Sequence, residues 1–132
     1  MKKQAKNWLD AALDDINTIK KIGNDETLTN IIAFHAEQAI EKSLKAILEE
    51  FESKVPRIHN VIKLKELTEK HIVFSVDNQL LAQISEVYSD ARYPSDLGLI
   101  PTGKPTINTA KTYEEFAESV YKIVLSNLLK GA

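Results

Sequence analysis

The feature that most constrains the fold is a long stretch of helical periodicity, from about Leu28 to about Glu52, that contains neither proline nor glycine. On a helical wheel its apolar side chains span about half of the circumference, more than an amphipathic surface helix usually presents to a core. The pattern therefore predicts a helix that packs against several neighbours. One stripe is made of mostly small residues, namely Ile32, Ala36, Ala39, Ser43 and Ala46. The stripe beside it is made of mostly large residues, namely Ala33, Ile40, Leu44, Ile47 and Phe51.

Helical periodicity continues through almost all of the chain. The sequence predicts an all-α fold in which four further helices cover about residues 4–22, 60–70, 77–91 and 113–129, and 132 residues suit a single domain over 1–132. Thr112 and Glu115 have the spacing of a capping box at the start of the last helix. The apolar segment His71–Val76 is interpreted as a connection, since a strand there would have no obvious partner.

An extended loop at about residues 92–109 holds three of the four prolines and two of the four glycines. Loops of this length are usually functional or disordered. Gly98 to Lys104 nearly spells a phosphate-binding loop, but proline occupies position 105, where that motif needs the hydroxyl of serine or threonine. We therefore do not interpret it as a phosphate loop.

Composition excludes several classes of function. There is no cysteine, so disulfides and thiolate metal sites are absent, and no histidine follows a glutamate at the Glu-x-x-His spacing of di-iron bundles. With 17 basic and 19 acidic residues, the net charge of −2 offers no global field for nucleic acid. Lacking a signal peptide or a membrane-length apolar run, the chain is expected to be a soluble cytoplasmic protein without metal or cofactor.

The polar arc of the long helix allows two interpretations. It holds His35, Gln38, Lys42 and Lys45. It can be a solvated face on which Glu41 and Lys45 form an i,i+4 pair. It can also face a groove or a second subunit, where the two lysines would meet phosphate. Asp14 and Asp15, in the first helix, are expected to be solvated.

Three segments, in the same order, resemble the HEPN family of small helical domains from bacteria and archaea. "AFHAEQAIEKSLKAIL" (33–48) resembles the second helix of that family, with its A-x-Q-A-x-E-K-x-L-K-A-x-L pattern. "RIHNVIKLKEL" (57–67) resembles its histidine-led third helix, and "YSDARYPSD" (88–96) its Y-x-x-x-R-Y-P element. The resemblance implies an up-and-down antiparallel bundle of about five helices that commonly forms a homodimer. It also suggests a minimal nucleotidyltransferase partner, often encoded beside such proteins in toxin–antitoxin-like pairs.

Many HEPN domains are metal-independent ribonucleases whose motif is arginine, four to six residues, then histidine. Here only one residue separates Arg57 from His59, and no histidine follows Arg92. The motif is absent, so we expect no catalytic residue. Cleavage would require folding to bring His35 or His59 to Arg92.

One local feature favours phosphate binding, because Lys54, Arg57, Lys63 and Lys65 occur within residues 54–65 without an acidic residue. The leading hypothesis is a non-catalytic HEPN-type domain that binds a nucleotide or RNA phosphate and acts with a nucleotidyltransferase partner. Its predicted ligand-binding residues are His35, Gln38, Lys42, Lys45, Arg57, His59, Arg92 and Tyr93. The alternatives are a structural dimerisation or partner-docking protein without ligand, and a ribonuclease with a displaced histidine. Arg57 and Arg92 could equally bridge acids such as Asp90 or Glu86.

Overall fold

The computed structural model describes residues 1–92 and 104–131, and for residues 88–92 the backbone alone. Over this part of the chain the prediction of an all-α fold is confirmed, with five α-helices and no strand. The helices are α1 (Lys3–Ile22), α2 (Thr29–Phe51), α3 (Val61–Thr68), α4 (Asn78–Arg92) and α6 (Ile107–Lys130), with a 3₁₀ turn at Glu26–Leu28 before α2. Residues 71–76 form a connection, as predicted.

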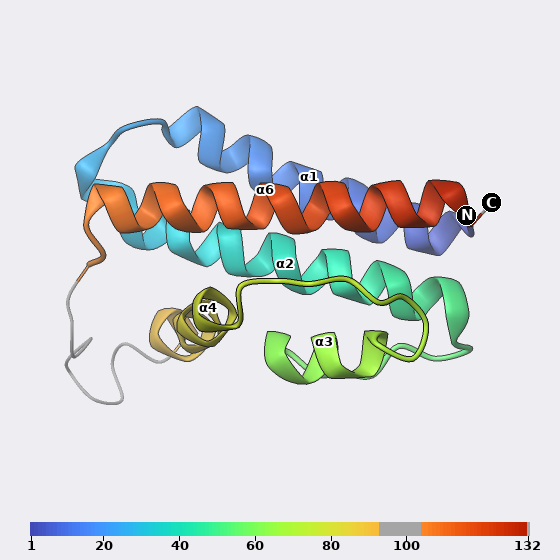
Figure 1. Ribbon diagram of the computed structural model, residues 1–132. Coiled ribbons are helices and arrows are strands. Elements are labelled where there is room, and N and C mark those ends of the chain that lie inside the picture. The colour runs from blue at the N-terminus through green and yellow to red at the C-terminus, as the bar shows by residue number, and fades with distance from the viewer. Residues whose placement is uncertain (93–103, 132) are drawn as a thin grey trace.

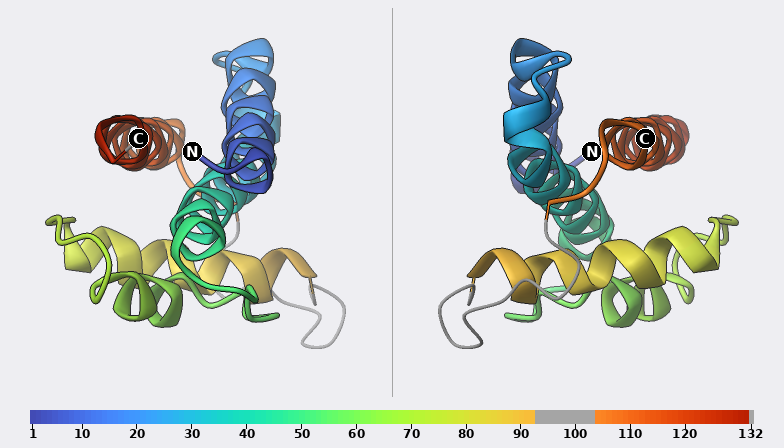
Figure 2. Two further views of the ribbon diagram at one scale, coloured as in Figure 1. Left: turned by 90° about the vertical axis from the view of Figure 1, so that its right-hand side faces the viewer. Right: turned by 90° about the vertical axis from the view of Figure 1, so that its left-hand side faces the viewer.

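The long helix predicted from the periodicity is the centre of the packed bundle. α2 contacts α1, α3, α4 and α6. Figure 1 shows α1 running antiparallel to α2, whereas α6 lies alongside in the same direction as α2. α4 is seen end-on in Figure 1 and lengthwise in Figure 2, where it crosses beneath α2 next to α3. α2 therefore separates a layer of long helices from a layer formed by α3 and α4.

Both apolar stripes of α2 supply the core, with one exception at its end. All five members of the small stripe are 0% exposed, and Ile40, Leu44 and Ile47 are at most 1% exposed. Burial of each large aliphatic side chain stabilises the fold by about 1.5–3 kcal/mol relative to leaving it exposed. Phe51 departs from the prediction, because it lies in the last turn of α2 and is 47% exposed.

The start of α6 corrects the sequence prediction. The helix begins at Ile107, not near Tyr113, and its N-cap is Thr106, whose side-chain oxygen accepts a hydrogen bond from the backbone N–H of Thr109 at 3.1 Å. The predicted capping box is wrong because Thr112 is already inside the helix, where its hydroxyl donates to the Asn108 carbonyl at 3.0 Å. The loop predicted at 92–109 is correspondingly shorter, and residues 93–103 of it lie outside the described part of the chain.

Candidate ligand-binding surface and buried ion pairs

Asp15, on α1, is buried between two side chains of the polar arc of α2. One carboxylate oxygen lies 2.8 Å from His35 Nδ1, and the other accepts a hydrogen bond from Lys42 Nζ at 2.7 Å. The side chain of Asp15 is only 9% exposed, and those of His35 and Lys42 are 25% exposed. The expectation that Asp15 is solvated is therefore wrong, because α1 packs along the polar arc of α2 and turns this carboxylate inward.

Glu41 organises a second group of predicted residues. Its Oε2 atom accepts a hydrogen bond from Lys45 Nζ at 3.0 Å and lies 3.1 Å from His59 Nδ1. The predicted i,i+4 pair of Glu41 and Lys45 thus forms, but in the interior, since their side chains are 5% and 7% exposed. Lys45 Nζ also lies 5.4 Å from the centre of the Trp8 ring, where the π-face favours a cation.

Glu37 is a buried carboxyl group that the sequence analysis missed. It is 0% exposed, and burial, followed by the nearby charge of Glu41, raises its pKa to about 8. Gln38 Nε2 donates to Glu37 Oε1 at 2.7 Å, whereas Glu37 Oε2 and Glu41 Oε1 are buried without a hydrogen-bond partner in the described structure. A signal existed, because Glu37 lies on the helical wheel between Leu44 and Leu48, which are both buried.

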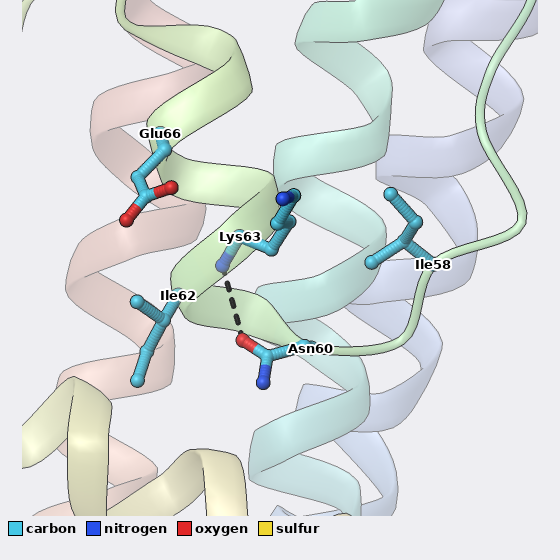
Figure 3. Close-up of a pocket in the computed structure, with 5 residues that line it drawn as sticks. All are labelled: Ile58, Asn60, Ile62, Lys63 and Glu66. Atoms are coloured by element: carbon cyan, nitrogen blue, oxygen red, sulfur yellow. Dashed lines mark hydrogen bonds between the residues drawn. The ribbon is translucent and has the colours of Figure 1, made fainter.

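A basic surface lies on the segment between α2 and α3. Lys54, Arg57 and Lys63 are exposed, and none of them forms an ion pair with a described residue. Beside them is an open hollow of about 400 Å³ with largely apolar walls, lined by Ile58, Asn60, Ile62, Lys63 and Glu66. Figure 3 shows Asn60 accepting the backbone N–H of Lys63, a bond of 3.0 Å that caps α3. We call the surface of residues 54–63 the α3-entry surface.

The predicted ligand-binding residues therefore fall into separate groups. Asp15 joins His35 to Lys42, Glu41 joins Lys45 to His59, and Gln38 contacts Glu37. Arg57 joins neither carboxylate and lies on the exposed α3-entry surface, which also contains His59. The side chain of Arg92 and the whole of Tyr93 lie outside the described residues.

The comparison with known protein families decides which family the chain represents. The model of the HEPN domain matches residues 5–128, nearly the whole sequence. The chain belongs to the HEPN domain family. Searches of curated proteins and of solved structures found no match to this HEPN domain.

In this HEPN domain each of the three histidines faces a carboxylate. His35 and His59 do so as described above, and His71 Nε2 lies 2.8 Å from Glu52 Oε2. A carboxylate can orient an imidazole ring for hydrogen bonding to a ligand. Within residues 1–92 and 104–131 no group of three or more potential ligands could hold a metal ion. No helix in those ranges has both the length and the apolar character needed to cross a bilayer.

Phe51 and His71 form an aromatic contact that was also missed. Their ring centroids lie 5.1 Å apart with an interplanar angle of 9°, so the rings are stacked. Phe51 continues the large apolar stripe, so the sequence pattern alone predicts it in the core. The pairing depends on the connection after α3, which brings His71 back to the end of α2, and no local pattern encodes it.

Proposed function

We propose that this HEPN domain is a non-catalytic module that binds the phosphate of a nucleotide or of RNA. The observation that carries the proposal is the exposed Arg57, which forms no ion pair with any described residue and has Lys54 and Lys63 on the same surface. A guanidinium group can bind two phosphate oxygens at once, which makes arginine well suited to such a ligand. Local cations of this kind can act despite a net charge of −2.

His59 would assist Arg57 at the same surface. Its side chain is 49% exposed and its Nδ1 faces Glu41, an arrangement that fixes the orientation of the ring. We propose that Arg92 contributes a further cation and that Tyr93 stacks on the base, because an aromatic ring beside arginines is suited to base stacking.

In this proposal Lys42 and Lys45 do not contact the ligand directly. Both ammonium groups already contact buried carboxylates, those of Asp15 and Glu41. A phosphate could bind either lysine only by displacing a carboxylate that would then remain buried without its partner, which is energetically costly. The primary contacts are therefore assigned to Arg57 and its exposed neighbours, while His35, Gln38, Lys42 and Lys45 stabilise α2, which precedes the segment that carries Arg57.

The proposal includes a protein partner. We infer that the domain acts with a separate nucleotidyltransferase, in a toxin–antitoxin-like pair, and that it forms a homodimer. Family membership supports this inference. Co-purification of the two proteins after co-expression, with the mass of the assembly measured by light scattering, tests the partner and the dimer together.

The ligand is tested by titrating the protein with ATP, GTP and a short single-stranded RNA while the integrity of the RNA is followed. We expect saturable binding that weakens with salt and is lost in Arg57→Ala, with the RNA left intact. Lys21→Ala is the matched control, because Lys21 is exposed on α1 and forms no ion pair with a described residue. An equal loss in both variants would contradict a site at Arg57, and RNA turnover lost in Arg92→Ala would favour the ribonuclease.

A structural role without ligand is the second candidate. It is favoured by the engagement of Lys42 and Lys45 inside the fold, which leaves the polar arc with a stabilising function of its own. Dimerisation or partner docking, combined with no binding of any of the three ligands, would support this candidate over the first.

A further inference from the structure

Phe51 combines exposure with a fixed position. It is the last residue of α2, and 47% of its surface is exposed although its ring is large and apolar. One exposed apolar residue needs no explanation by itself. Phe51 differs from an isolated exposed residue because the ring of His71 stacks against it, with 5.1 Å between the ring centroids. This stacking fixes the orientation of the Phe51 ring.

His71 is itself held in place from the other side. Its Nε2 atom lies 2.8 Å from Glu52 Oε2, and its side chain is only 19% exposed. Glu52 therefore orients His71, and His71 in turn supports Phe51. We call Phe51 and His71 the aromatic platform.

Two exposed lysines adjoin the aromatic platform in the sequence. Lys54 follows Phe51 by three residues, a distance of at most about 11 Å along the chain, and Lys70 directly precedes His71. Both lysines are exposed and form no ion pair with a described residue. The acids that adjoin the platform in sequence each have a contact in the described structure. Glu52 faces His71 at 2.8 Å, Glu50 lies 3.9 Å from the N-terminal amine, and Glu69 lies 3.2 Å from Lys65 Nζ.

We propose that the aromatic platform stacks an unpaired base of single-stranded nucleic acid, whose flanking phosphates contact Lys54 and Lys70. An exposed, supported ring next to cations is the arrangement by which proteins bind single strands without reading their sequence. The inference rests on the proposed function and narrows it, because the same strand continues along the basic segment toward Arg57. The ligand is then a single strand and not a free nucleotide.

The hollow of the α3-entry surface is less suited to a base than the aromatic platform. The hollow of the α3-entry surface is lined by two isoleucines, Asn60, Lys63 and Glu66, with no aromatic ring among them. Glu66 would repel a phosphate there. Of these two surfaces, the platform at Phe51 is therefore assigned a stacked base, and the cations of the connecting segment are assigned the phosphate contacts.

The experiment uses ten-nucleotide single strands that carry one fluorescent 2-aminopurine, as RNA and as DNA, together with the same label in a duplex. Stacking on the platform quenches the fluorescence, so we expect quenching by the wild-type protein with either single strand and little with the duplex. Phe51→Leu keeps the apolar bulk but removes the ring. It should abolish the quenching and weaken binding roughly 5- to 150-fold, the loss of one base–aromatic stack.

Two further variants and a check of folding show whether the effect of Phe51→Leu comes from loss of the aromatic ring or from a general disturbance of the protein. Phe51→Tyr should retain the quenching, and Leu129→Ala, at a residue 59% exposed on α6, should leave binding unchanged. Circular dichroism establishes that Phe51→Leu is folded. If Phe51→Leu were unfolded, two other results would decide. The platform would still be supported if Phe51→Tyr quenches the fluorescence and the double variant Lys54→Ala/Lys70→Ala does not. It would be overturned if Phe51→Tyr fails to quench or if the double variant still quenches.

The outcomes also separate this inference from the proposed function. Binding without quenching, equally strong in wild type and Phe51→Leu, would overturn the platform and leave a phosphate site at Arg57 intact. Binding to neither strand nor to nucleotides would overturn both. Quenching with RNA alone would support the platform and restrict its ligand to RNA.

Discussion

The carboxylate of Asp15 binds Lys42 Nζ at 2.7 Å although the two residues are 27 positions apart in the chain, and this ion pair joins α1 to α2. Only the antiparallel packing of the two helices brings the groups together. The same carboxylate also faces His35 at 2.8 Å, so one acidic group serves both polar side chains. Half of the predicted polar arc thus has a role in holding the bundle.

Replacement of Asp15 by asparagine should destabilise the protein. The amide has the same shape but leaves the side chain of Lys42, which is 25% exposed, without its counter-charge. We expect the free energy of unfolding to fall by about 1–3 kcal/mol, measured by urea denaturation. Asp14→Asn removes the same charge from the adjacent, exposed position and should change little. Equal effects of the two substitutions would show that the pair contributes nothing specific.

The raised pKa of Glu37 predicts how the stability of the fold depends on pH. Its pKa is about 8 in the folded protein and 4.5 ordinarily, so between these values the folded state retains a proton that the unfolded state has lost. Stability must then fall as pH rises from 4.5 to 8, and the contribution is constant outside this window. Glu37→Gln resembles the protonated acid and lacks this dependence.

We therefore expect Glu37→Gln to gain stability relative to wild type as pH rises from 4.5 to 8. Urea denaturation at several pH values within and beyond this window measures the difference. Glu115→Gln, at an exposed position of α6, is the control and should follow wild type. Curves for Glu37→Gln and wild type that run parallel over the whole range would refute the raised pKa.

Alanine substitutions of Thr106 and Thr112 distinguish the two possible starts of α6. Thr106→Ala removes the side chain that accepts the Thr109 N–H and should cost about 1 kcal/mol of stability. Thr112→Ala affects a hydroxyl inside the helix and should be nearly neutral. Thermal denaturation of both variants gives the comparison, and a larger loss for Thr112→Ala would restore the capping box.

The small stripe of α2 should not tolerate larger side chains. Ala39 is 0% exposed, and Ala39→Leu would force neighbouring helices apart at a cost of about 1–3 kcal/mol. Ala82→Leu adds the same atoms at an exposed position of α4 and serves as control. Urea midpoints that coincide for the two variants would mean that the neighbours of Ala39 move without cost.

Periodicity predicted the core of α2 well because burial of residues such as Ile40 and Ala46 repeats with the helix itself. It failed for Asp15 and Glu37, because a polar residue near an apolar stripe becomes buried only when a neighbouring helix covers it. The start of α6 was misplaced because its cap, Thr106, lies within a segment rich in proline and glycine. The sequence pattern identified candidate site residues such as Lys42. It could not identify their partners, because those partners are remote in the sequence.

The central position of α2 also has a consequence for how the protein opens. α3 and α4 have their most extensive contacts with α2 and smaller ones with each other, whereas α1, α2 and α6 all contact one another. Hydrogen exchange should therefore divide the molecule into two cooperative units of different stability. We expect the α3–α4 layer, which carries Lys63, to open at a lower free energy than the three long helices, so a ligand bound at Lys63 should slow hydrogen exchange in that layer first.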